Sequence, residues 1–180
     1  MPTFALPLKK ELTKFLRNYL IQFVGLKPGK HGFSFDAGEM FFEAFEHPEV
    51  SNGDVQVGLV LDKQSSMLVL EFELNGIVNV LCDRCGDPLD QPVQGDFRLI
   101  VKFGDGEFEQ TDEIIILPHG EHEINVAKYI YEFIILALPQ RRIHPEGQCN
   151  EEAIKRIESY GKGNDEPPTD PRWEALKGLK

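Results

Sequence analysis

The chain has 180 residues, of which 41% are hydrophobic, and this is enough for one domain with a hydrophobic core. It carries 19 lysines and arginines against 30 aspartates and glutamates, a formal net charge of −11. Its apolar stretches are too short to span a membrane, its amino terminus lacks a signal-peptide pattern, and three cysteines are an odd number for a disulfide framework, so we expect a reduced, cytoplasmic protein.

The amino-terminal half reads as β-structure. Residues 19–24 predict a strand that ends at Gly25, and Phe33 and Phe35 open the next strand. Apolar and polar residues alternate over residues 55–61 and again over 68–74, so these two segments are predicted to pair as a hairpin.

The dipeptide Asn75-Gly76 is typical of a two-residue turn, and it predicts a third strand at residues 77–81 that completes a meander. Residues 93–103 alternate most regularly and predict another strand. Residues 104–123 are rich in acidic side chains and predict a solvated loop around a short strand at 114–117.

Helical spacing begins after Asn125, a plausible N-cap, and we expect this helix to end at Pro139. A second helix is predicted over residues 151–160. The fold class predicted is α+β, with a mainly antiparallel β-sheet or partly open barrel and a C-terminal helical segment packed on it. We expect one domain over residues 1–160, a flexible linker over 161–171 and a short amphipathic segment over 172–180.

Cys82 and Cys85 form a C-x-x-C pair followed by a glycine, a pattern that lets two thiolates reach one metal ion from a tight turn. His144 and Cys149 follow the first predicted helix. Together the four residues supply the three-cysteine, one-histidine set of a closed tetrahedral zinc site, so we predict one structural zinc ion.

Two alternatives stay open for the cysteines. In the first, Cys82 is a buried strand residue and the other two thiols have no metal-binding role. A redox pair is the second, although such a pair belongs at the start of a helix, and a strand is predicted here. The chain has no G-x-S-x-G elbow and no dinucleotide fingerprint, so we expect neither an enzyme nor a small-molecule substrate.

Arginines near the cysteines offer a local contact for RNA despite the acidic total. Arg84 lies within the C-x-x-C pair, and Arg141 and Arg142 precede His144. Their guanidinium groups suit phosphate, or else they form salt bridges with the acidic loop.

At the carboxyl end, an apolar stripe predicts either docking on a partner or folding back onto the sheet; it consists of Trp173, Leu176 and Leu179.

Three segments resemble the YceD family in the family's order: residues 81–89 around the C-x-x-C pair, residues 132–149 from the helix exit to the last cysteine, and residues 170–179. The resemblance implies a non-enzymatic role in the accumulation or processing of large-subunit ribosomal RNA and in assembly of the large ribosomal subunit. It implies as partner a large-subunit precursor or a small basic ribosomal protein, and the acidic charge fits such a partner. The competing hypotheses are a zinc-ribbon-like adaptor or regulatory module unrelated to ribosomes, and a C-x-x-C redox protein.

Overall fold

The computed structural model describes residues 14–45, 49–50, 52–104 and 114–161. The elements follow the chain in the order η1 (Leu16–Tyr19), β1 (Leu20–Gln22), β2 (Gly29–Ala37), α2 (Glu39–Ala44), β3 (Asn52–Lys63), β4 (Met67–Leu81), β5 (Pro88–Phe103), β6 (Ile114–Leu117), β7 (Glu123–Asn125), α3 (Ala127–Leu136) and α4 (Glu151–Gly161).

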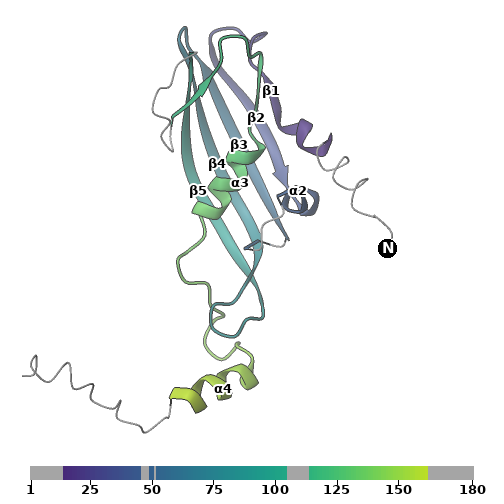
Figure 1. Cartoon of the computed structure of the whole chain (residues 1–180), viewed down its shortest axis with the longest axis vertical. Helices are drawn as coiled ribbons and strands as arrows, with labels where there is room; N and C mark the ends of the chain where they lie inside the picture. Colours follow the sequence, from purple (N-terminus) through teal and green to yellow (C-terminus); the bar gives the residue numbers. More distant parts are fainter. Residues whose placement is uncertain (1–13, 46–48, 51, 105–113, 162–180) are drawn as a thin grey trace, which may run out of the picture.

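Five strands form one open sheet in the order β2-β3-β4-β5-β6. The first four pair antiparallel, and β6 runs parallel to β5. β1 and β7 form a separate antiparallel pair. In Figure 1, α3 lies across one face of the long strands, and α4 lies beyond the end of the sheet at which β4 turns into β5. The predicted α+β class with a mainly antiparallel sheet is confirmed, and the sheet is not closed into a barrel.

The core lies between the sheet and α3. Alternate side chains along most of β3 and β4 are buried, as the alternation predicts, and α3 buries Ile130 and Ile134 against the sheet. The ring of Phe133 on α3 stacks on Phe97 of β5 with 4.6 Å between the centroids, and it meets Phe72 of β4 edge-on at 5.0 Å. These rings fix the helix over the middle of β4 and β5.

The predicted turn at Asn75-Gly76 is wrong. β4 runs without a break from Met67 to Leu81, and Gly76 pairs with Val55 of β3. A Cβ at Gly76 would overlap the backbone oxygen of Asp54 and lie 2.5 Å from Cα of Val55. The glycine therefore serves a close approach of two strand backbones, not a turn. The expected meander is instead a long β3–β4 hairpin, to which β5 adds the third strand.

Smaller differences concern element ends. α3 ends at Leu136, three residues before the predicted end at Pro139, because the residue before a proline disfavours helical backbone. The strand expected over residues 19–24 is only Leu20–Gln22, because Tyr19 closes the short helix η1. Its partner β7 was not predicted, since three residues are too few to show alternation. The N-cap of α3 is Val126 and not the predicted Asn125, which ends β7; the Asn125 side-chain oxygen still accepts a hydrogen bond from the Ala127 N–H at 2.9 Å.

The remaining predicted elements agree with the structure. β5 contains the strand predicted over 93–103, β6 matches 114–117, and α4 matches 151–160. No helix in the described part of the chain is long and apolar enough to span a membrane. Beyond Gly161, the predicted linker and the amphipathic segment at 172–180 lie outside the described residues.

Candidate metal centre

The turn between β4 and β5 carries the first two cysteines. The Cys82 side chain is buried, and Cys85 is half-buried. The Cys82 N–H donates to the Asp87 carbonyl and the Gly86 N–H donates to the Cys82 carbonyl, both at 2.9 Å. Gly86 has a φ of +79°, which residues with a Cβ rarely adopt. The glycine thus lets the chain fold back within one turn and brings both sulfur atoms to the same side.

The segment after α3 is attached to this turn through Asp83 and Arg142, which are 59 positions apart. The Asp83 N–H donates to the Arg142 carbonyl at 2.7 Å, and the Arg142 N–H donates to the Asp83 carboxylate at 2.7 Å. This backbone donor, together with the Arg142 guanidinium and the charge of Arg141, lowers the pKa of Asp83. These hydrogen bonds therefore place the second half of the Cys/His set beside the first.

His144 is oriented by the first residue of β5. Its Nε2 lies 3.0 Å from the Pro88 carbonyl oxygen, and its Nδ1 lies 3.4 Å from the Cys85 sulfur. A carbonyl oxygen can only accept, so Nε2 carries the hydrogen and Nδ1 of the neutral ring keeps its lone pair. A backbone carbonyl behind the ring is the usual outer partner of a metal-ligating histidine. The ring therefore presents a ligand atom toward the cysteines.

Cys149 follows a tight turn. The Gln148 N–H donates to the Pro145 carbonyl at 3.1 Å, and Gly147 takes a φ of +82°, as the third residue of a type II turn does. This turn reverses the chain after His144 and returns the last cysteine to the other three residues.

Asn150 fixes the other side of Cys149. Its side-chain oxygen accepts hydrogen bonds from the N–H groups of Glu152 at 3.0 Å and Ala153 at 3.3 Å, so it caps α4. Its amide nitrogen donates to the Asp87 carboxylate at 3.2 Å. The start of α4 is therefore joined to the β4–β5 turn directly beside the cysteines.

The four side chains, Cys82, Cys85, His144 and Cys149, form what we call the Cys/His cluster, and their ligand atoms all lie within 4.8 Å of one another. In a tetrahedral zinc site the ligand bond lengths place two sulfurs about 3.8 Å apart and a sulfur and a nitrogen about 3.6 Å apart. The 3.4 Å between Cys85 and His144 is close to that value. The widest pairs need a contraction of roughly 1 Å, within the reach of a side-chain rotation. The donor set and its spacing fit one zinc ion.

The thiols differ in how readily they ionise. Burial opposes ionisation of Cys82, but hydrogen bonds from the backbone N–H groups of Cys85, His144 and Arg84 outweigh it and lower the pKa to about 6. Burial raises the pKa of Cys149, and its hydrogen bonds to Cys82 and Cys85 raise it further. Ionisation of the Cys82 thiol is thus favoured, and ionisation of the Cys149 thiol is opposed. A coordinated divalent cation reverses this, because it deprotonates the thiols that bind it.

The position of the C-x-x-C pair bears on the competing redox reading. A redox-active pair usually lies at the amino terminus of a helix, whose dipole stabilises a thiolate. Here the pair lies in the turn between two strands, and β5 begins at Pro88. A zinc ion held by all four side chains would have no open position for water or substrate, so the chemistry of this arrangement is structural.

Two of the three predicted arginines are exposed, and the third is occupied by carboxylates. Arg142 pairs with Asp83 at 3.4 Å and with Glu49 at 3.9 Å. Among the described residues, the acidic partners of Arg142 are thus Asp83 and Glu49; the predicted salt bridges with the 104–123 loop fall largely on residues 105–113, which lie outside the described part of the chain. Arg84 and Arg141 are exposed at the same end of the sheet.

Trp173, Leu176 and Leu179, the other predicted contact residues, lie outside the described part of the chain. The supporting residues Asp83 and Asn150 were not predicted from the sequence. Asn150 stands before two glutamates at a helix start and carried a recognisable capping signal. Nothing in the local sequence marks Asp83, whose partner is distant along the chain.

Comparison with known families gives one match. The family model described as "Large ribosomal RNA subunit accumulation protein YceD" matches residues 70–180, more than half of the chain. The matched part contains β5, α3, α4 and the complete Cys/His cluster, and most of β4. No curated protein and no solved structure matched the chain.

Proposed function

The chain belongs to the YceD family, and on this premise we propose that it is a non-enzymatic factor in the accumulation of large-subunit ribosomal RNA and in assembly of the large ribosomal subunit. The observation that carries the proposal is the family match itself, which includes every member of the Cys/His cluster. The family's description names the process. In this proposal the Cys/His cluster stabilises the end of the sheet at which the β4–β5 turn lies, and that end takes part in the process.

In this proposal the Cys/His cluster binds one zinc ion and acts as a clamp. It joins the β4–β5 turn to the segment before α4, two parts of the chain that are also linked by hydrogen bonds of Arg142, His144 and Asn150. Four protein ligands make the role structural, in agreement with a binding factor. Metal analysis of protein purified without a metal-affinity column should find about one zinc per chain.

The partner is a large-subunit precursor particle or a small basic ribosomal protein. The net charge of −11 supports a basic protein, because opposite potentials speed encounter and exclude wrong partners. A local contact with ribosomal RNA at Arg84 and Arg141 is compatible with this, since both side chains are exposed beside the clamp.

The decisive experiment combines genetics with recovery of partners. Loss of the gene should lower the ratio of large- to small-subunit ribosomal RNA, and the wild-type chain should restore it. A tagged chain should recover large-subunit precursors, with RNA and proteins identified together. An unchanged ratio, or recovery of transcription complexes in place of ribosomal particles, would refute the assembly role and favour the adaptor hypothesis.

A chain truncated after Tyr160 tests the closing segment that contains Trp173, Leu176 and Leu179. Lower thermal stability of the truncated chain means that this segment docks on its own domain. Unchanged stability with loss of precursor recovery means that the segment recognises a partner.

A further inference from the structure

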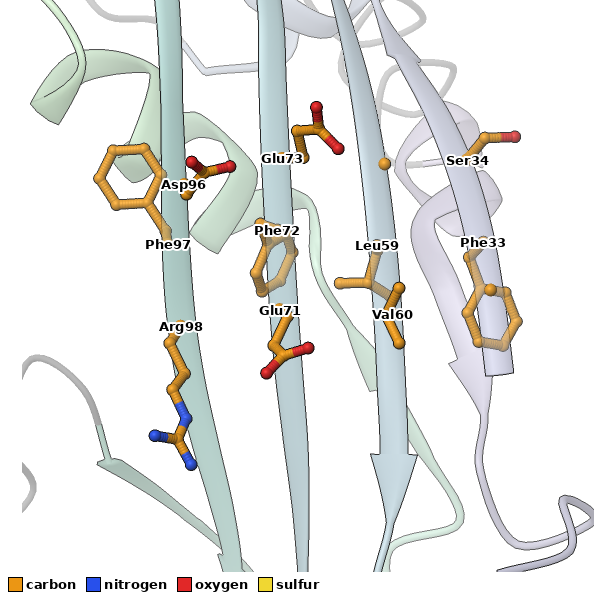
Figure 2. Close-up of a pocket in the computed structure, with 12 residues that line it drawn as sticks. Phe33, Ser34, Leu59, Val60, Glu71, Phe72, Glu73, Asp96, Phe97 and Arg98 are labelled. Atoms are coloured by element: carbon orange, nitrogen blue, oxygen red, sulfur yellow. The ribbon is translucent and has the colours of Figure 1, made fainter. Parts of the chain in front are cut away.

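One face of the large sheet is not covered by α3. The inward-facing residues of β2 to β5 meet the core, and the alternate residues of the same strands point the other way and are mostly exposed. We call this second surface the outer face. Figure 2 looks onto it, with α3 behind the strands. Nothing in the described part of the chain packs over its centre, so it is open to a partner.

The centre of the outer face is hollowed. An open groove of about 770 Å³ crosses β2 to β5. Gly32 and Gly58 face it, and their lack of side chains leaves the space open: a Cβ at Gly32 would meet nothing within 4 Å, and one at Gly58 would come only to 3.9 Å from Glu73. On the β2–β3 side of the groove, Gly32 and Gly58 therefore leave space next to the side chains of Val60 and Ser34.

Acidic side chains stand on the β4–β5 side of the groove. Glu73 of β4 is directly opposite Asp96 of β5, and Glu71 is opposite Arg98. Figure 2 shows Glu73 and Asp96 side by side on neighbouring strands. Like charges at directly opposed positions destabilise a sheet, and a cation placed between them relieves the repulsion. The bare protein thus carries an unfavourable pair that a basic ligand would stabilise.

The negative charge extends over the whole outer face. Outward positions of β2 to β5 hold seven carboxylates and three cations; the acids are Asp36, Asp54, Asp62, Glu71, Glu73, Asp90 and Asp96, and the bases are Lys30, Arg98 and Lys102. Among the apolar residues that line the groove, Val60 lies on the outer face opposite Glu71 and is 37% exposed, whereas the side chains of Phe33 and Leu59 pack toward the core. An exposed valine beside carboxylates suits lysine and arginine, whose aliphatic stems cover apolar surface while their charged ends reach the acids.

We propose that this groove binds a lysine- and arginine-rich segment of a protein. The inference rests on the proposed function and deepens it, because it names the face of this chain that holds the basic partner. Basic side chains insert at Gly32 and Gly58 and place their charges at Glu73 and Asp96. The excess of carboxylates disfavours RNA at this face, since a phosphate backbone would be repelled.

The first experiment removes charge. The probe is a fluorescent peptide of about 12 residues in which lysine and arginine alternate with valine and leucine. As a helix or a strand it is long enough to cross four strands about 4.8 Å apart. Its binding to the full chain is measured by fluorescence anisotropy. The variant Glu71→Gln, Glu73→Gln, Asp96→Asn should bind about tenfold more weakly. The control Glu39→Gln, Glu121→Gln, Glu152→Gln makes the same change in net charge at exposed positions outside the groove and should stay within about twofold. Equal losses in both variants would show attraction by the general field alone and overturn the proposal.

The second experiment fills the groove without changing charge. Gly58→Val adds a side chain where the structure has room, so the sheet should retain its stability while peptide affinity falls. The control Gly25→Val introduces the same side chain at a position that is also open but does not line the groove. Peptide affinity that is unchanged in a folded Gly58→Val variant would refute insertion at this site.

A third arm separates this inference from the assembly role and from the chain's own carboxyl end. If the wild type recovers large-subunit precursors from cells and the groove variants recover them equally well, the assembly role stands and the groove is wrong. If the peptide binds in the groove but the wild type recovers no ribosomal particle, the groove stands and the assembly role fails. A chain truncated after Gly161 that binds the peptide much more tightly would identify residues 162–180 as the occupant and overturn the proposal of a separate partner.

Discussion

Removal of metal should release the clamp and α4 while leaving the sheet intact. The perturbation is either a strong chelator or the substitution Cys85→Ser, which removes one of the four ligands. The sheet has its own core of buried side chains between the strands and α3. α4 has no comparable support, since Ile157 is 49% exposed and Tyr160 is 83% exposed. An isolated helix of this length is marginal in water.

The magnitude follows from the contacts of residues 142–150. Ordering these residues costs about 1 to 1.5 kcal/mol each, or roughly 9 to 14 kcal/mol in total. Five hydrogen bonds join Arg142 (three), His144 and Asn150 to the β4–β5 turn, and they return about 5 kcal/mol. A structural zinc ion contributes about 10 kcal/mol or more at neutral pH. The segment is thus ordered with the metal and should detach without it.

Hydrogen exchange followed by mass spectrometry tests this directly. Amides of residues 82–87 and 142–161 should lose protection when the metal is removed, and amides of β3 and the centre of β4 should keep it. Cys85→Ser should resemble the chelated wild type and show no further response to chelator. His122→Asn, an exposed histidine outside the Cys/His cluster, is the matched control and should respond as the wild type does.

Two results would contradict this reasoning. If chelation unfolds the whole chain in one transition, the sheet depends on the metal and the core is not self-sufficient. If α4 keeps its protection after the metal is lost, the hydrogen bonds alone hold the segment and the cluster is not a clamp.

Three further predictions concern the sheet, a buried phenol and the exposed arginines. Gly76→Ala should lower the free energy of unfolding by about 3 kcal/mol or more in urea titrations, because the new methyl group overlaps the β3 backbone; Gly58→Ala, which has room, should leave it nearly unchanged. Burial raises the pKa of Tyr19 to about 12, so the folded state holds this proton more tightly than the unfolded state; stability should fall by about 2 kcal/mol between pH 10 and pH 12, and Tyr19→Phe should remove that part of the decline. If RNA binds beside the clamp, Arg84→Ala with Arg141→Ala should reduce the slope of log affinity against log salt by about 2; an unchanged slope would place RNA elsewhere or nowhere.

Local patterns predicted the elements where alternation was long. Residues 55–61, 68–74 and 93–103 lie in β3, β4 and β5 as expected, and the apolar spacing after Asn125 identified α3. The failure at Asn75-Gly76 has a physical cause. A glycine serves a positive φ in a turn and a close backbone approach within a strand equally well, and only the neighbouring strand distinguishes the two. That neighbour is some twenty residues away in the sequence.

The Cys/His cluster was predictable because the chemistry of zinc restricts the candidates. Three cysteines and a nearby histidine complete one site, although 59 positions separate Cys85 from His144. The groove was not predictable in this way. Gly32, Gly58, Glu73 and Asp96 come from four strands, and their meeting depends on the register of three strand pairs. A slip of one residue in any pair would move these side chains to the opposite face.

The cluster and the groove share β4 and β5 yet are separate along them. Glu73 is opposite Asp96, and the last pair before the cysteine turn, Leu81 with Pro88, lies eight residues further along β4. At about 3.4 Å per residue this is roughly 27 Å, well beyond the screening length of charges in physiological salt. Charge removal in the groove therefore leaves the electrostatics of the cluster unchanged, and release of the clamp leaves Glu73 and Asp96 on strands that the core still holds. Under the two proposals, the centre of the acidic sheet receives a basic protein segment and its far end, held by metal, presents exposed arginines, so a single precursor particle would engage both with opposite charges.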